Sequence, residues 1–174
     1  MKHKIGIFGS ANGTPENVIK NAETIGKELG KRGEIVITGA TSGIPHAASI
    51  SAHKNGAEVW GFSAARDLKE HEKFVPKDYP FIGNLDVCRK YRNVTSTASC
   101  DAGIIIKGRW GTLNEFTNLN DMGKIIGVLT GVGGIAEELP HLCETVYKKT
   151  GCRIVFNNSP EKLVEEVINE LNNK

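Results

Sequence analysis

Four runs of mostly β-branched residues in this sequence each end in a glycine-rich segment and are followed by a stretch of helical periodicity. The glycine-rich segments are residues 9–13, 38–43, 107–112 and 130–134. Runs of this kind that alternate with helices are typical of β-α-β units, whose strands pair in parallel. The sequence therefore predicts an α/β fold, a Rossmann-like three-layer sandwich with a doubly wound, mainly parallel sheet of about six or seven strands.

The same pattern predicts where the individual elements lie. Strands are expected at residues 5–8, 35–37, 59–62, 102–106, 125–129 and 153–156. Helices are expected at residues 14–31, 45–54 and 87–99, from 113, at 136–149, and from 159 onward. Residues 64–84 contain two prolines and show no clear period, so we expect a long loop there. A loop of that length usually has a function.

Length and composition fit one globular domain covering residues 1–174, since 39% of the 174 residues are hydrophobic and 24% are charged. The 22 Lys and Arg residues are scattered among 20 Asp and Glu residues, which argues against an electrostatic nucleic-acid binder. No run approaches the roughly 18 apolar residues of a membrane span. We therefore expect a cytoplasmic protein with neither a nucleic-acid nor a membrane partner.

The cysteines and histidines show no metal-binding pattern. The five histidines form no cluster with the four cysteines, and no Cys-x-x-Cys pair occurs among Cys88, Cys100, Cys143 and Cys152. Reduced thiols in structural positions, and no metal site, are the expectation.

The four glycine-rich segments point to a ligand. In an open parallel sheet, ligands bind outside the carboxyl ends of the strands, so the four segments are expected to converge on one site. Their backbone N–H groups, with the positive end of the following helix, can bind a phosphate without Lys or Arg. One such turn has an equally good structural explanation, because a tight strand-to-helix turn needs glycine. Four together favour a phosphorylated ligand, and the absence of Walker A and Gly-x-Gly-x-x-Gly motifs argues against ATP hydrolysis and NAD chemistry.

Several segments carry a resemblance to a known family. Residues 92–93 (Arg-Asn), residues 101–106 and the segment 108–115, which ends in Gly-Thr-Leu-Asn-Glu, resemble the Arg motif and the Pro-Gly-Gly-x-Gly-Thr-x-x-Glu motif of the LOG-like proteins in the SLOG superfamily. These include cytokinin riboside 5′-monophosphate phosphoribohydrolases, lysine decarboxylase-like proteins and molybdenum-cofactor carriers. The resemblance covers nearly the whole chain and implies a Rossmann-like nucleotide-binding fold.

The resemblance also implies a set of site residues. Arg92 and Glu115 take the catalytic positions, and no metal or cofactor takes part. Glu115 would stabilise an oxocarbenium-like sugar and orient the attacking water, while Arg92 would bind the leaving base, the phosphate or Glu115 itself. The phosphate and nucleotide contacts are expected from Gly9, Ser10, Ala11, Asn12, Gly39, Thr41, Ser42, Gly43, Gly108, Arg109, Trp110, Gly111 and Thr112.

Other roles remain open for four of these residues. From spacing alone, Arg92 and Glu115 are equally well explained as an ion pair that ties two helices together. Arg109 is either a bidentate phosphate donor or a solvent-facing side chain. Trp110 either covers the base or ribose or packs at a subunit contact.

Two functions follow from the resemblance. The first is a nucleoside 5′-monophosphate phosphoribohydrolase, which releases a free base and ribose 5-phosphate. The alternative is a non-catalytic nucleotide or molybdenum-cofactor carrier or sensor, and it is favoured where Lys107, Arg109 and Asn114 replace the Pro, Gly and acidic residue of the active hydrolases. Nucleoside deoxyribosyltransferases, a third class, fit the Gly-Thr-x-x-Glu turn poorly.

Assembly is also implied, because the family is generally dimeric. We therefore expect a homodimer or a higher homo-oligomer, with Leu119 and Met122 extending an apolar surface beyond what one small domain needs.

Overall fold

The computed structural model of the chain describes residues 2–80, 84–87, 89–146 and 148–174. In this part of the chain seven strands form one parallel sheet in the order β4-β3-β2-β1-β5-β6-β7. The predicted α/β fold with a parallel sheet is thereby confirmed. The strands are β1 (Lys4–Gly9), β2 (Ile35–Thr38), β3 (Glu58–Ser63), β4 (Leu85–Val87), β5 (Ala102–Ile106), β6 (Ile125–Leu129) and β7 (Arg153–Asn157).

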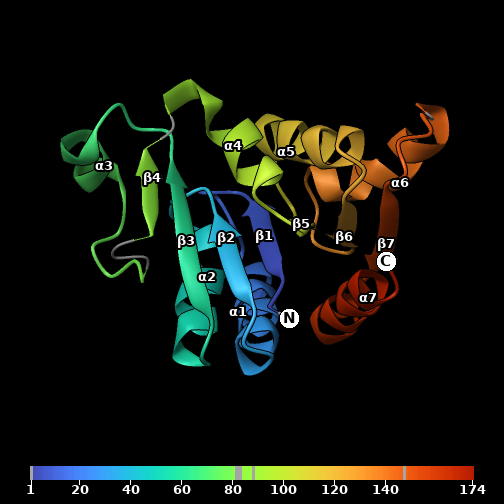
Figure 1. The fold of residues 1–174 in the computed structure, drawn as a ribbon, viewed down its shortest axis with the longest axis horizontal. Coiled ribbons are helices and arrows are strands. Elements are labelled where there is room, and N and C mark those ends of the chain that lie inside the picture. Colours follow the sequence, from blue (N-terminus) through green and yellow to red (C-terminus); the bar gives the residue numbers. More distant parts are fainter. Residues whose placement is uncertain (1, 81–83, 88, 147) are drawn as a thin grey trace.

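Helices cover both faces of the sheet, which makes the fold doubly wound (Figure 1). One face carries α1 (Glu16–Lys31), α2 (Ile44–Lys54) and α7 (Pro160–Asn172), and the other carries α4 (Arg92–Ala98), α5 (Trp110–Asp121) and α6 (Ile135–Thr145). The chain winds outward from β1 to β4 and then returns to β5 on the other side of β1. The β1–β5 pair is therefore the switch point at which open parallel sheets bind ligands.

The core explains the apolar runs of the sequence. Every residue of β5 and β6 is buried, because helices lie on both faces of the sheet and remove the need for alternation. Helix α1 packs so closely on α2 that a Cβ atom at Gly26 would lie 2.2 Å from the carbonyl oxygen of Ala48. A Cβ atom at Gly30 would lie 2.5 Å from the carbonyl oxygen of Ala52. These glycines serve helix packing and have no connection with a ligand.

The structure differs from the expectation in two segments. Residues 64–84, expected as a loop, contain the helix α3 (Leu68–Phe74), which begins where the Asp67 side chain accepts a hydrogen bond from the Glu70 N–H. The helix expected at 87–99 begins at Arg92, because β4 and a 3-10 turn (Arg89–Tyr91) precede it. Three residues of an edge strand are too few to show a period of two, so the sequence pattern missed β4.

Further boundaries follow from the described part of the chain. Helix α6 ends at Thr145, although the sequence pattern continued it to 149. Residues 81–83 of the expected loop, and Cys88, lie outside the described residues. Among the helices that the structure describes, none combines the length and the apolar character needed to cross a membrane.

Candidate functional site

The glycine-rich turns are joined in pairs on either side of the β1–β5 contact. The N–H of Ile44 donates to the carbonyl oxygen of Ser10 at 3.0 Å, which fixes the turn after β2 on the turn after β1. Between them, Gly43 has a φ of +70°, and a Cβ atom there would lie 2.5 Å from that same oxygen. Gly43 is therefore required by backbone packing.

The other pair repeats this geometry. The N–H of Ile135 donates to the carbonyl oxygen of Gly108 at 3.0 Å, and Gly134, with a φ of +70°, occupies the position that Gly43 has in the first pair. In two of the four turns, those after β2 and β6, a glycine is therefore required because two backbone segments are in close contact.

A cavity of about 140 Å³ lies at the switch point, and the turns after β1, β2 and β5 form its walls. Ten of the expected site residues line it. These ten are Gly9, Ser10, Ala11, Gly39, Thr41, Arg92, Arg109, Gly111, Thr112 and Glu115.

Five expected site residues lie outside this cavity: Asn12, Ser42, Gly43, Gly108 and Trp110. Ser42 lines the neighbouring cavity and donates from Oγ to the carbonyl oxygen of Ala11 at 3.0 Å. Trp110 is 85% exposed.

Arg92 connects two walls of the cavity. Its Nη1 donates to the carbonyl oxygen of Gly39 at 3.1 Å, and its Nη2 lies 3.8 Å from Oε1 of Glu115. A Cβ atom at Gly39 would lie 1.8 Å from Nη1, so glycine is what admits the guanidinium. The Nε of Arg92 is buried and has no hydrogen-bond partner among the described residues.

Glu115 is the most perturbed acidic group of the cavity. Its side chain is only 6% exposed. Burial raises the pKa of Glu115 to about 7, and the nearby Arg92 lowers it in part. Both protonation states are therefore populated near neutral pH, a condition that suits a general acid or base.

The N-terminus of α5 faces the cavity through Gly111 and Thr112. Its N-cap residue, Arg109, has an extended backbone, and no side chain caps the helix. The first-turn N–H groups and the positive end of the helix dipole at this end of α5 therefore favour the binding of an anion in the cavity. Helix α2 is less suited to this role, because its first N–H is used by Ser10 and its second residue, Pro45, has no N–H.

The turn after β6 does not join the site, so the expectation that all four turns converge is wrong. The N–H groups of Val132 and Gly133 donate to Oε1 of Glu137 at 2.9 and 3.1 Å. This turn contributes no residue to the cavity. Its amide groups are satisfied by a carboxylate of the helix that follows it.

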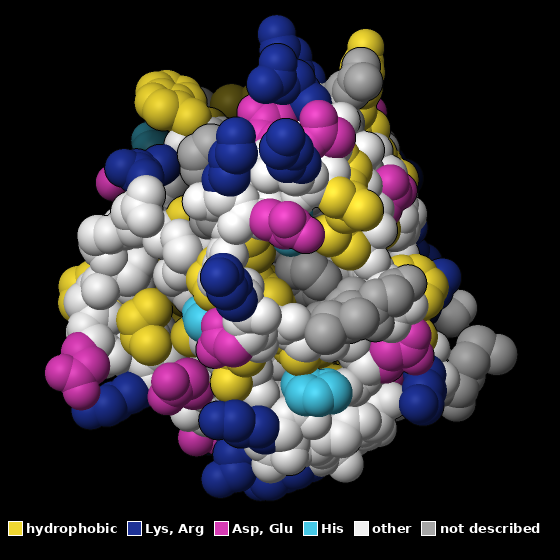
Figure 2. Space-filling view, turned by 90° about the vertical axis from the view of Figure 1, so that its left-hand side faces the viewer, with side chains coloured by type: hydrophobic (Ala, Val, Ile, Leu, Met, Phe, Trp, Pro, Cys, Tyr) yellow, Lys and Arg dark blue, Asp and Glu magenta, His cyan; other side chains and the backbone are white. Residues whose placement is uncertain are grey.

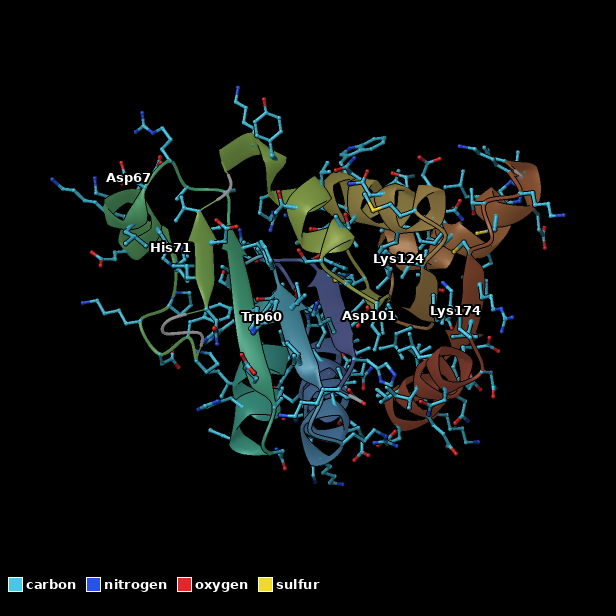
Figure 3. All side chains as sticks on the ribbon, in the orientation of Figure 1. Trp60, Asp67, His71, Asp101, Lys124 and Lys174 are labelled. Carbon is cyan, nitrogen blue, oxygen red and sulfur yellow. The ribbon has the colours of Figure 1, made fainter. Side chains whose placement is uncertain are left out.

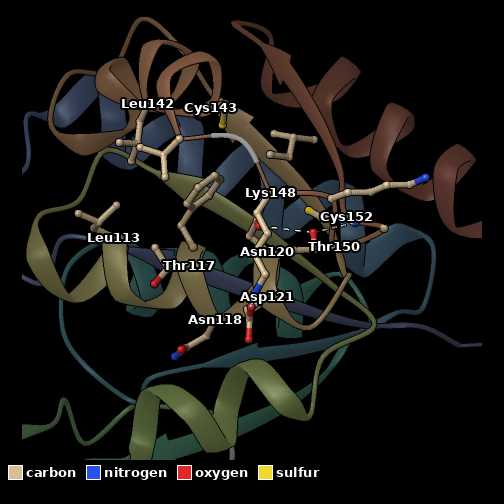
Figure 4. A pocket seen from close by; sticks show the side chains of 15 residues that line it. Leu113, Thr117, Asn118, Asn120, Asp121, Leu142, Cys143, Lys148, Thr150 and Cys152 are labelled. Atoms are coloured by element: carbon tan, nitrogen blue, oxygen red, sulfur yellow. Dashed lines mark hydrogen bonds and ion pairs between the residues drawn. The ribbon is translucent and has the colours of Figure 1, made fainter.

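A larger cavity lies elsewhere, between α5, α6 and the start of β7 (Figure 4). Its volume is about 850 Å³, and none of the glycine-rich turns lines it. Burial and the neighbouring Cys143 thiol raise the pKa of Cys152 to about 11, and burial raises the pKa of Cys143 as well. Thiols with raised pKa values are poor nucleophiles, which agrees with a structural role.

Metal-ligand clusters were expected to be absent. Among the described residues, no group of three His, Cys, Asp or Glu side chains is placed to bind a metal ion. His46 instead contacts Asp78, with Nε2 and Oδ1 3.0 Å apart.

Comparison with known proteins identifies the family. The family model described as the SLOG cluster4 family matches residues 2–164, and no curated protein sequence matches the chain. Solved structures that share the fold include a molybdenum cofactor binding protein from Rippkaea orientalis, with a TM-score of 0.78, 21% identity and 98% of both chains covered.

Two other solved structures with this fold are the molybdenum cofactor carrier protein of Chlamydomonas reinhardtii and DNA processing protein A of Helicobacter pylori. The carrier has a TM-score of 0.74 and 18% identity over 99% of this chain and 100% of that one. The Helicobacter protein, whose structure concerns single-stranded DNA binding, has a TM-score of 0.64 and 17% identity over 97% of this chain and 81% of that one. The resemblance to the SLOG superfamily is thereby confirmed, and the chain belongs to the SLOG cluster4 family.

Proposed function

We propose that this protein binds a phosphorylated, nucleotide-like small molecule at the β1–β5 switch point and acts as a carrier or sensor for it. The observation that carries the proposal is the uncapped N-terminus of α5, which opens into a cavity that also contains Arg92 and Arg109. A helix N-terminus with two guanidinium groups beside it favours a phosphate.

The choice of a binding protein has two supports. Lys107, Arg109 and Asn114 depart from the motif of the hydrolases within the segment that forms the phosphate turn. Molybdenum cofactor binding and carrier proteins share the fold over nearly the whole chain. The ligand class proposed here, a phosphate ester attached to a heterocycle, includes both nucleotides and such cofactors.

A phosphoribohydrolase is the second candidate, because Glu115 and Arg92 favour it. Glu115 lies in the second turn of α5, so a sugar attached to a phosphate at the helix N-terminus would approach its carboxylate. An ionised Glu115 would stabilise the oxocarbenium-like transition state, and Arg92 would bind the leaving base.

A titration separates these functions. We expect inorganic phosphate and nucleoside monophosphates to bind, and Arg109→Ala to weaken both by about tenfold, since a charged hydrogen bond is lost. Arg153→Ala, on the distant β7, is the matched control. Chromatography of the same mixtures would detect released base. Release that falls by about a hundredfold in Glu115→Gln, with affinity unchanged, would establish the hydrolase instead.

We further propose that the partner macromolecule is a second copy of this chain. Tyr91, Val94 and Trp110 are 74%, 49% and 85% exposed, and they lie at the start of α4 and α5. Leu119, expected on this surface, is fully buried in the core and cannot contribute. On the face that carries α3 and β4, basic and acidic side chains are mixed, so this face gives no support to a nucleic-acid partner (Figure 2).

A further inference from the structure

A second cavity adjoins the one at the switch point and shares three wall residues with it: Ala11, Gly39 and Thr41. Its volume is about 350 Å³, and its other walls come from the end of β3 and from α3. The two cavities are therefore neighbours at the carboxyl ends of β1 and β2. The larger of the two has a volume within the usual range for small-molecule sites.

The two cavities differ in charge. Arg92 and Arg109 line the first, together with the N-terminus of α5. The second has no Lys or Arg among its lining residues, and its charged group is the carboxylate of Glu70. A ligand that spans both therefore places its anionic end in the first cavity and hydrogen-bond donors in the second.

Local hydrogen bonds fix the Glu70 carboxylate at this cavity. Its Oε2 accepts from the backbone N–H of Arg66 at 2.6 Å and from the Arg66 side chain at 3.1 Å. These bonds lower the pKa of Glu70, so the group is ionised at neutral pH. Among the described residues, Oε1 accepts no hydrogen bond.

Small residues form much of the remaining wall, notably Ala40, Ala64 and Ala65, and His71 and Val75 complete it on the side of α3. On the same side, Ser63 contacts Nδ1 of His71 at 2.8 Å and accepts from the N–H of Ala65 at 3.1 Å. Asp67 and His71 lie at the start and in the middle of α3, at the β4 edge of the sheet (Figure 3). Because the alanine side chains are small, a flat ring can approach the backbone after β2 and the backbone after β3. Glu70 is the ionised hydrogen-bond acceptor beside that position.

We propose that this second cavity binds the heterocyclic ring of the ligand and that Glu70 recognises a ring edge with an amide N–H beside an amino group, as in guanine and pterins. Because Oε2 is held by Arg66, Oε1 with its two lone pairs would accept both hydrogens of such an edge. Hypoxanthine lacks the amino group, and adenine lacks the ring N–H. The inference rests on the proposed ligand-binding function and adds the ring specificity to it.

Calorimetric titration with GMP, IMP, AMP and inorganic phosphate tests it. We expect GMP to bind at least about tenfold more tightly than IMP or AMP, because IMP and AMP each lack one hydrogen bond to the charged carboxylate. Glu70→Gln keeps an oxygen for the Arg66 N–H and removes the charge. It should abolish the preference for GMP and leave phosphate affinity unchanged. Glu72→Gln, on the same helix and outside the cavity, should keep the preference.

Ala65→Leu is a second variant, which fills the cavity with a larger side chain. It leaves unchanged the Asp67 and Glu70 side chains that bond to the backbone at the start of α3. It should weaken GMP binding by about tenfold and leave phosphate binding unchanged. Equal affinity of the wild type for GMP and IMP, or GMP binding that Ala65→Leu does not alter, would overturn the ring site while phosphate binding still supported the proposed function. No binding of phosphate or of any nucleotide would overturn both.

Discussion

Nη2 of Arg92 lies 3.8 Å from Oε1 of Glu115, beside the switch point between β1 and β5. This distance is too long for a hydrogen bond, although the two groups are close enough to interact electrostatically. Burial therefore outweighs the arginine, and the pKa of Glu115 rises to about 7. A closed structural ion pair would lower that pKa instead. The geometry favours an Arg92–Glu115 pair whose two charged groups make direct contacts only when a ligand is bound between or beside them.

The raised pKa of Glu115 predicts a pH-dependent stability. The folded protein binds the proton more tightly than the unfolded chain, so the stabilisation is complete below 4.5, the ordinary pKa of a glutamate, and is lost as pH rises toward about 7. Glu115→Gln has no such proton. Between about pH 4.5 and pH 8, the free energy of unfolding of the wild type should fall relative to the variant by on the order of 3 kcal/mol. Urea denaturation at several pH values measures this difference, and parallel pH profiles would contradict it.

Gly39 should be essential for the position of Arg92. In Gly39→Ala the added methyl group collides with Nη1, which has to move from its place in the cavity. Nη1 is the far end of a flexible side chain, so we expect only the loss of its hydrogen bond to Gly39, about 1 kcal/mol of stability, and a loss of phosphate affinity of about tenfold. Denaturation and calorimetry measure the two effects. Gly111→Ala is the control for stability, because a Cβ atom there has nothing within 4 Å. A Gly39→Ala protein as stable as the wild type would show that the guanidinium is not confined.

The fold was predictable because its central strands are continuous apolar runs with helices between them. Residues 102–106 and 125–129 became β5 and β6 with the expected bounds. The edge was not predictable. β4 is three residues long, and its pairing of Leu85 with Gly61 depends on a partner distant in sequence. Helix α3 is highly charged, and its residues 69–73 are as easily explained as a solvated loop.

Within the site, motif spacing brought Arg92 and Glu115 together, and both line one cavity. The turn after β6 was wrongly predicted to join the site, because the spacing of glycines does not show which group accepts hydrogen bonds from the backbone N–H groups. A sign was present in the sequence, since Glu137 follows Gly134 by three residues, the position of a carboxylate that caps a helix N-terminus. Glu70 was missed because only the folded chain brings it to the end of β3.

Lys107 stands where the hydrolase motif has proline, and its backbone explains why proline does not fit here. Its φ is +55°, whereas proline requires about −65°. Lys107→Pro should lower the free energy of unfolding by about 2 kcal/mol or more. Lys107→Gly is compatible with this φ and loses only the 3.4 Å contact from Nζ to the carbonyl oxygen of Val132, so its stability should change little. Thermal unfolding compares the two, and equal stability would contradict the left-handed backbone.

Self-association should depend on the exposed apolar residues at α4 and α5. We expect the wild type to sediment as a dimer or larger species. Replacing Val94 and Trp110 by Ser removes apolar surface and should shift it to a monomer. Phe156→Ser, on β7 and 38% exposed, is the control that should not alter the sedimentation. A wild-type monomer at high concentration would remove this proposal.

Glu137 is expected to stabilise the turn after β6 in place of an external anion. Its Oε1 accepts two backbone N–H groups, from Val132 and Gly133, as a phosphate oxygen would. Glu137→Ala should therefore lower stability by about 1 kcal/mol, and its exposed neighbour supplies the control, Glu138→Ala. Because the variant leaves the two amides open to anions, inorganic phosphate should raise its melting temperature more than it raises that of the wild type. An equal effect of phosphate on both proteins would mean that the turn binds no anion even when its carboxylate is removed.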